Sequence, residues 1–154
     1  MRHPLPALAL LCLPAFALGG ELMLSPATVA VDNGQTSTEL VLTYHGGSGV
    51  TDVDTEYSLG LERLGWVEVE AIPSPTPDYE VWCQLVNGRV RALVASRTLA
   101  PLPSNTSIPL CRMRVRPHAH TPRGVYNIRP VGPYEFANGI PVSIDASTTL
   151  VYVR

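Results

Sequence analysis

Three carboxylates alternate along one segment of the chain, at Asp52, Asp54 and Glu56. Successive side chains of an extended strand point to opposite faces, so these three should share one face. Carboxylates in such a row repel one another unless cations compensate their charge. Calcium is one candidate cation, but a straight row is poor geometry for the six or more oxygen ligands that calcium takes. Arginine is the other, since the sequence contains no lysine. We therefore expect arginines to compensate the row, and no cofactor.

Histidine offers a second possible metal site. His118 and His120 have the spacing of two metal ligands, and His45 is the only other histidine after residue 20. Zinc needs three or four convergent ligands, so polar loop residues are the simpler interpretation. The sequence also lacks the Gly-x-Ser-x-Gly, His-Glu-x-x-His and phosphate-binding glycine motifs. We predict neither a metal site nor enzyme activity.

The two halves of the chain carry opposite charge. Residues 21–80 hold eleven acidic side chains and a single arginine, Arg63. Residues 81–154 hold nine arginines and only two acids, Glu135 and Asp145. We favour the interpretation that the halves pack together and their strands neutralise each other; a bipolar surface that orients a partner is the alternative. Because the net charge is −2, nucleic acid is not an expected partner.

The start of the chain is typical of a signal peptide. A short basic beginning is followed by an apolar run over residues 5–18, which is too short to span a membrane. Ala17 and Gly19 supply small residues at the positions that a signal peptidase reads. We predict that residues 1–20 are removed, with cleavage near Gly19 or Gly20. No second apolar run of spanning length follows, so no membrane-spanning segment is expected.

The remaining residues, 21–154, are long enough for a single domain with its own core. We expect this domain to be periplasmic or extracellular, where disulfides can form. It keeps two cysteines, Cys83 and Cys111, both at positions that read as inward-facing. We predict a bridge between them, which the entropic estimate values at about 3–4 kcal/mol. Two buried free thiols are the alternative.

Alternating apolar residues dominate the rest of the sequence. Residues 108–117, 124–131 and 140–153 show the pattern most clearly, which is the period of a strand with one buried face. No segment keeps a helical period, so we predict an all-β sandwich. The predicted strands are 21–24 with 28–32, 38–44, 49–59, 65–72, 79–86, 89–96, 108–116, 125–131 and 148–153. Asn87-Gly88 is the strongest hairpin signal, and the glycine-rich stretch 45–49 is predicted to be a flexible loop.

Several short pieces occur in a recognisable order. They are Val29 and Val31, Leu40-Val41-Leu42, residues 49–59 with their similarity to a V-x-G-x-D…Y strand, the Asn87-Gly88 hairpin leading to residues 90–95, and Glu135-Phe136-Ala137-Asn138-Gly139 followed by Ile140-Pro141. This order resembles the cohesin-like family, the sandwich modules related to cellulosomal cohesins and to certain carbohydrate-binding modules. The resemblance covers essentially all of residues 21–154.

The resemblance implies a jelly-roll of about nine strands in two sheets, immunoglobulin-like in appearance, and a binding role without catalysis. We number the nine predicted strands in chain order and count 21–24 with 28–32 as strand 1. The resemblance then implies strand order 8-3-6-5 in one sheet and 9-1-2-7-4 in the other. The acidic strand then lies between one strand carrying Asn127 and Arg129 and another carrying Arg89 and Arg91, and Trp82 faces the same way. The predicted binding surface consists of Trp82, Asp52, Asp54, Glu56, Arg89, Arg91, Asn127 and Arg129. The alternative is a structural ladder of charges with Trp82 covered by the proline-rich connector 73–77.

Three functions are compatible with the predicted fold and binding surface. The first is an exported, non-catalytic module that attaches proteins to one another at the cell envelope or outside the cell. The second is a carbohydrate-binding module, which would stack sugars on exposed aromatic residues. The aromatic candidates are Trp66, Tyr79, Trp82 and Tyr134. The third is a structural accessory of a secretion or envelope assembly, recognised through its edge strands.

Overall fold

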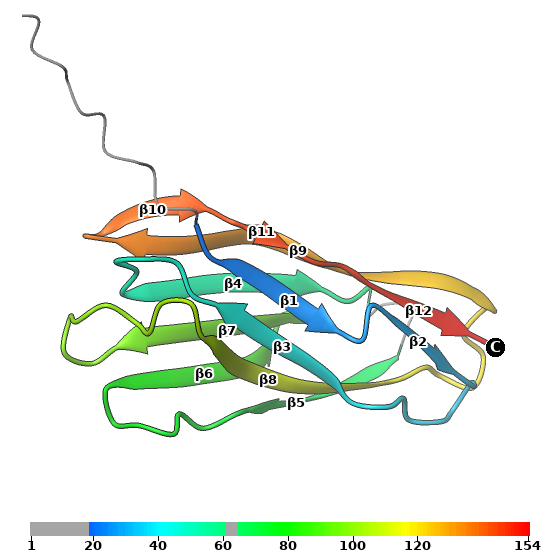
Figure 1. The fold of residues 1–154 in the computed structure, drawn as a ribbon. Coiled ribbons are helices and arrows are strands. Elements are labelled where there is room, and N and C mark those ends of the chain that lie inside the picture. Colours follow the sequence, from blue (N-terminus) through cyan, green and yellow to red (C-terminus); the bar gives the residue numbers. More distant parts are fainter. Residues whose placement is uncertain (1–18, 61–64) are drawn as a thin grey trace, which may run out of the picture.

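The computed structural model describes residues 19–60 and 65–154, and within them it contains strands and no helix. Residues 1–18 of the predicted signal peptide lie outside the described residues. Figure 1 shows the strands in two layers. The strands are β1 (Glu21–Ser25), β2 (Thr28–Val31), β3 (Leu40–His45), β4 (Asp52–Ser58), β5 (Trp66–Ala71), β6 (Tyr79–Val86), β7 (Arg89–Ser96), β8 (Ser107–Arg116), β9 (Gly124–Ala137), β10 (Ile140–Ser143), β11 (Asp145–Ala146) and β12 (Thr149–Val153).

The two sheets confirm the predicted all-β sandwich. One sheet has the order β11-β1-β3-β8-β5 and the other β2-β12-β9-β4-β7-β6, with β10 paired to β9 at its edge. The implied order 8-3-6-5 corresponds to β9-β4-β7-β6, and 1-2-7-4 corresponds to β1-β3-β8-β5. The acidic strand β4 therefore lies between β9 and β7, as expected.

The position of the last strand differs from the expectation. It was expected beside the first strand in the five-stranded sheet. β12 does lie beside β2, the second half of that predicted strand, but both belong to the other sheet, where β12 also pairs with β9. The first strand divides at Pro26, which has no amide hydrogen to continue a ladder. The buried Thr149 hydroxyl connects the two sides of this break. It donates to the Pro26 carbonyl at 2.9 Å and shares the proton with the Leu24 carbonyl at 3.4 Å. Only the two residues of β11 continue the five-stranded sheet beyond β1.

Strand alternation builds the core between the sheets. In β4 the side chains of Val53, Thr55 and Tyr57 are buried while their neighbours face outward. Leu40 and Leu42 of β3 do the same from the opposite sheet, and both are fully buried. Burial of each large apolar side chain stabilises the fold by roughly 1.5–3 kcal/mol.

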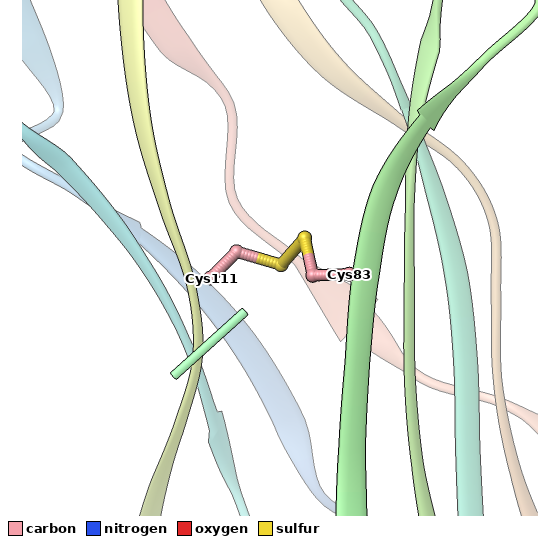
Figure 2. The surroundings of a disulfide bond; sticks show 2 residues. All are labelled: Cys83 and Cys111. Atoms are coloured by element: carbon pink, nitrogen blue, oxygen red, sulfur yellow. A yellow bond between two sulfur atoms is a disulfide. The ribbon is translucent and has the colours of Figure 1, made fainter. Parts of the chain in front are cut away.

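A disulfide joins the two layers, which confirms the predicted bridge. Cys83 of β6 and Cys111 of β8 are bonded, and their Cα atoms lie 6.0 Å apart. Figure 2 shows the bond crossing from one sheet to the other. Both residues are buried. The bridge therefore ties the sandwich together at the side opposite β12.

Two hairpins have an Asn-Gly dipeptide in their turn. Asn87-Gly88 joins β6 to β7, as predicted, and both residues have positive φ, 49° and 77°. Asn138-Gly139 joins β9 to β10 in the same way, with φ values of 53° and 74°. The sequence prediction ended β9 at residue 131 and missed this second hairpin. The chain instead continues through a β-bulge, which shifts the register against β4 between Asp54 and Glu56.

The loop that follows β3 is packed into the end of the sandwich, in contrast to the flexible loop that we expected. Gly46 and Gly47 are both buried. The Gly46 amide donates to Thr106 O at 3.1 Å, and the Gly47 amide donates to the Tyr44 hydroxyl at 3.0 Å. A Cβ on Gly46 would overlap the carbonyl oxygen of Pro103, so glycine is needed for this close approach.

Candidate binding face

The outer face of β4 carries the three carboxylates, and arginines of β7 compensate two of them. The Arg91 guanidinium donates twice to Asp54, from Nε to Oδ1 at 3.3 Å and from a terminal nitrogen to Oδ2 at 2.8 Å. Arg89 contacts Glu56 Oε2 at 3.0 Å. The hydrogen bond to Asp54 and its charge raise the pKa of Arg91. The prediction that arginines pair with this row is thus confirmed for these two acids.

Asp52 is held differently. Its Oδ2 accepts a hydrogen bond from the Thr51 hydroxyl at 2.7 Å. It lies opposite Ala95 on β7 and Phe136 on β9, so no arginine shares its register position. Among the six ion pairs of the described residues, none includes Asp52.

Asn127 and Arg129 face outward on β9 but do not join the acidic row. Arg129 lies opposite Ser58, and the nearest acid along β4, Glu56, pairs with Arg89 instead. Asn127 lies beyond the end of β4, opposite Leu150 of β12. The expected cross-strand pairs from this strand are therefore absent from the part of the chain that the structure describes. The register of β9, which the sequence does not specify, is the reason.

Trp82 lies in a row that crosses four strands. Trp82 of β6 is opposite Leu93 of β7, Leu93 is opposite Asp54 of β4, and Asp54 is opposite Tyr134 of β9. Trp82 is 37% exposed and Tyr134 is 43% exposed, so the proline-rich connector does not cover the indole. Three strand spacings separate β6 from β9, which places the backbones of Trp82 and Tyr134 about 14 Å apart.

The two aromatic residues flank the Asp54–Arg91 ion pair. A shallow depression of about 360 Å³ lies beside the indole, lined by Glu80, Val81, Trp82, Arg91 and Leu93. Tyr134 was not predicted on this face, because the strand prediction stopped before the bulge. The alternation of Tyr134, Glu135 and Phe136 would not have placed it there, because the pattern favours the two aromatic residues inside, whereas only Glu135 is buried.

The outer face of the other sheet is different in character. Arg112 and Arg114 both contact Glu39, at 3.7 and 3.2 Å, and they lie opposite Glu70 and Glu68 of β5. Charges of both signs thus alternate across this face. Its exposed Trp66 lies on the edge strand β5, away from any second exposed aromatic ring of the sheet.

Only two of the four aromatic candidates for sugar stacking share a face. Tyr79 is 7% exposed and belongs to the core, which excludes it as a stacking platform. Trp66 lies on the opposite sheet from Trp82 and Tyr134. Of the four candidates, Trp82 and Tyr134 thus remain on one face, and their strands are three strand spacings apart, so they do not form a continuous platform.

The histidines do not converge. His45 Nδ1 lies 3.3 Å from the Ser107 hydroxyl, and His118 and His120 lie in the loop after β8. Within residues 19–60 and 65–154 no three His, Cys, Asp or Glu side chains lie close enough to hold a metal ion.

No protein family and no curated protein matches this sequence. Solved structures do match. The sixth cohesin of Acetivibrio cellulolyticus scaffoldin B, solved in complex with a mutant Cel5 dockerin, is 14% identical with a TM-score of 0.65, over 88% of this chain and 99% of that one. The third ScaB cohesin of R. flavefaciens, in complex with a group 1 dockerin, is 16% identical with a TM-score of 0.65, over 92% and 99%.

A third match comes from outside cellulosomes. The non-cellulosomal cohesin of the hyperthermophilic archaeon Archaeoglobus fulgidus is 14% identical with a TM-score of 0.61, over 88% of this chain and 91% of that one. At such identities the likeness shows the fold and not the partner. The chain has the fold of a cohesin module.

Proposed function

We propose that this chain is a non-catalytic protein-binding module and that its partner docks on the outer face of β6, β7, β4 and β9. The observation that carries the proposal is the row Trp82–Leu93–Asp54–Tyr134, in which two exposed aromatic rings flank an ion pair. The fold supports it, because cohesins of the same fold have been solved in complex with dockerins.

The chemistry of this face suits a protein surface better than a small molecule. Tryptophan, tyrosine and arginine are the residues that most often dominate binding energy at protein interfaces. The depression beside Trp82 is shallow and open, so it offers little enclosure for a small ligand. The Asp54–Arg91 pair is only partly exposed and gives the face a fixed pattern of charge. Such a pattern selects among partners and fixes their orientation.

We also propose that the module is exported to the periplasm or the extracellular space. The signal-peptide pattern of residues 1–20 supports this location. The Cys83–Cys111 disulfide supports it independently, because such bonds persist in oxidising compartments. In the described part of the chain, no helix has the length and apolar character needed to cross a membrane.

Binding should be tested with a pair of matched tryptophan variants. Immobilised protein would be exposed to dockerin modules and to the exported proteins of the source organism, as wild type, Trp82→Ala and Trp66→Ala. We expect Trp82→Ala to weaken capture about tenfold or more, as for a typical hot spot. Trp66→Ala should leave it unchanged, because that indole lies on the other sheet. Equal capture by both folded variants would exclude this face.

A second measurement separates the alternatives. Pull-down on insoluble polysaccharides tests the carbohydrate function, and depletion of the protein from solution would favour it over the protein-binding function. A partner that survives both tryptophan substitutions would favour recognition through an edge strand. The candidate edge is β10, where Ile140 and Val142 are exposed.

A further inference from the structure

Glu135 is a buried carboxylate that forms no ion pair with any residue that the structure describes. It is 5% exposed and points inward from β9, opposite the fully buried Val53. Each of the six ion pairs among the described residues joins an acid of residues 21–80 to an arginine of residues 81–154. None of them includes Glu135. An isolated charge in a protein interior is unfavourable unless it is paired.

The groups that contact Glu135 are neutral donors. Its Oε2 accepts hydrogen bonds from the Gly20 amide at 2.9 Å and from the Tyr44 hydroxyl at 3.0 Å. The Tyr44 hydroxyl in turn accepts the Gly47 amide at 3.0 Å. The carboxylate therefore reaches across the sandwich to the residue that immediately precedes β1. Figure 1 shows that β1 begins at the same end of the sandwich as β10.

Glycines shape the space around the Gly20 nitrogen. A Cβ on Gly20 would overlap the ring of Tyr44. A Cβ on Gly47 would lie 2.8 Å from the Gly20 nitrogen and 3.2 Å from Glu135 Oε2. Gly20 is buried whereas Gly19 is exposed, so the interior ends at the bond between these two residues.

The same bond is where the small residues Ala17 and Gly19 direct a signal peptidase. We propose that the chain is cleaved between Gly19 and Gly20, and that the new α-ammonium group of Gly20 forms a buried ion pair with Glu135. Residues 1–19 would then be removed, one residue fewer than the segment 1–20 that the sequence pattern led us to expect. The cleavage is a hydrolysis. The water oxygen adds to the Gly19 carbonyl carbon and the peptide C–N bond breaks. Gly19 leaves as a carboxylate, and the Gly20 nitrogen takes up protons to become an ammonium group. The proposal is independent of the proposed binding function.

Cleavage at this bond supplies the missing cation. The Gly20 nitrogen already lies at hydrogen-bond distance from Oε2, so the ion pair needs no rearrangement. Hydrogen bonds between charged groups are roughly twice as strong as those between neutral groups. A chain that begins one residue earlier would place its charge on the exposed Gly19. A chain that begins at Glu21 would lose the donor altogether.

The position of cleavage can be measured directly. The full chain, leader included, would be expressed in an exporting bacterial host, and the intact mass of the exported protein determined. We expect the mass of a chain that begins at Gly20. A chain that begins at Gly19 or at Glu21 would overturn the proposal.

The ion pair can be measured because the sequence contains no lysine, which makes the α-amino group the only aliphatic amine of the cleaved chain. Acetylation by an N-hydroxysuccinimide ester, followed by mass spectrometry, then reports on this group alone. We expect the native protein to react at least about tenfold more slowly than the urea-unfolded protein, because the group must first open to solvent. Equal rates would overturn the proposal, and this comparison needs no variant.

Two variants assign the protection to the carboxylate. Glu135→Gln keeps the shape of the side chain and removes its charge, and we expect it to raise the native acetylation rate several-fold. Glu21→Gln is the matched control, because Glu21 is exposed and adjacent to the amine, and it should leave the rate unchanged. If Glu135→Gln folds and reacts no faster than wild type, the ion pair does not exist.

Discussion

The Tyr44 hydroxyl donates to Glu135 Oε2 over 3.0 Å, and the two residues come from opposite sheets. Tyr44 is fully buried on β3, and Glu135 is buried on β9. A polar link thus crosses the interior at the end of the sandwich where the chain enters β1. The Cys83–Cys111 disulfide is a covalent link between the sheets at another place, from β6 to β8.

Tyr44→Phe should destabilise the domain more than a typical loss of one tyrosine hydroxyl. The substitution removes a donor to Glu135 and leaves the Gly47 amide, which the hydroxyl accepts, without a partner. We expect a loss of about 1–3 kcal/mol in the free energy of unfolding, measured by urea denaturation. Tyr57→Phe is the control, because the Tyr57 hydroxyl makes a single hydrogen bond, to Ser147 O at 3.2 Å. A larger loss in Tyr57→Phe would contradict the importance of the polar link.

The domain should lose stability in alkaline solution. Burial raises the pKa of Tyr44 and of Tyr57 far above the ordinary tyrosine value of 10.0. The folded state therefore holds these two protons more tightly than the unfolded state, so their contribution is complete below about pH 10 and is lost as the pH rises further. We expect the urea midpoint to fall above that pH, and the phenolate absorbance of both residues to appear only on unfolding. A Tyr57→Phe protein should show a shallower fall; an unchanged slope would contradict this cause.

The sequence predicted the acidic face because strand alternation does not depend on where a strand starts. The outward direction of Asp54 and Glu56 follows from the alternation of side chains along a strand, and so does that of Trp82. Their pairing with arginine required the strand order, which came from the family resemblance. The Asn87-Gly88 turn then set the register of β6 against β7.

The missed features share a physical reason. Gly132 and Pro133 are ordinary strand breakers, so a bulge within β9 could not be told from the end of the strand. The prediction therefore named Tyr134 only as a possible sugar-stacking residue and left it off the predicted binding surface. It gave Glu135 no structural role, since an acidic residue is assumed to face solvent. Similarly, Gly46 and Gly47 were interpreted as a flexible loop, whereas their small size permits a close backbone contact that only the tertiary structure reveals.

Loss of the disulfide should weaken the domain substantially without preventing strand formation. The bridge closes a loop of 28 residues, for which chain entropy predicts about 3–4 kcal/mol. We expect a Cys83→Ala, Cys111→Ala protein to lose about that much free energy of unfolding. Because both cysteines are buried, the native bridge should also resist dithiothreitol until urea unfolds the chain. Rapid reduction of the folded protein would contradict this burial.

Substitution of Arg91 should separate a binding role from a structural one. The Arg91 and Asp54 side chains remain 46% and 30% exposed, and solvent screens such pairs, so Arg91→Ala should leave the urea midpoint nearly unchanged. Partner binding should nevertheless weaken about tenfold, because Asp54 loses the charge that compensates it within the interface.

Arg114→Ala is the matched control for this substitution. Arg114 forms a comparable ion pair with Glu39, at 3.2 Å, on the outer face of the other sheet, and it is 50% exposed. Binding isotherms of the two variants against the same captured partner give the comparison. Equal affinity of the two variants would mean that the charges of β4 and β7 form only a solvated ladder of ion pairs. If neither face contacts the partner, removing an ion pair from either face has the same effect on binding.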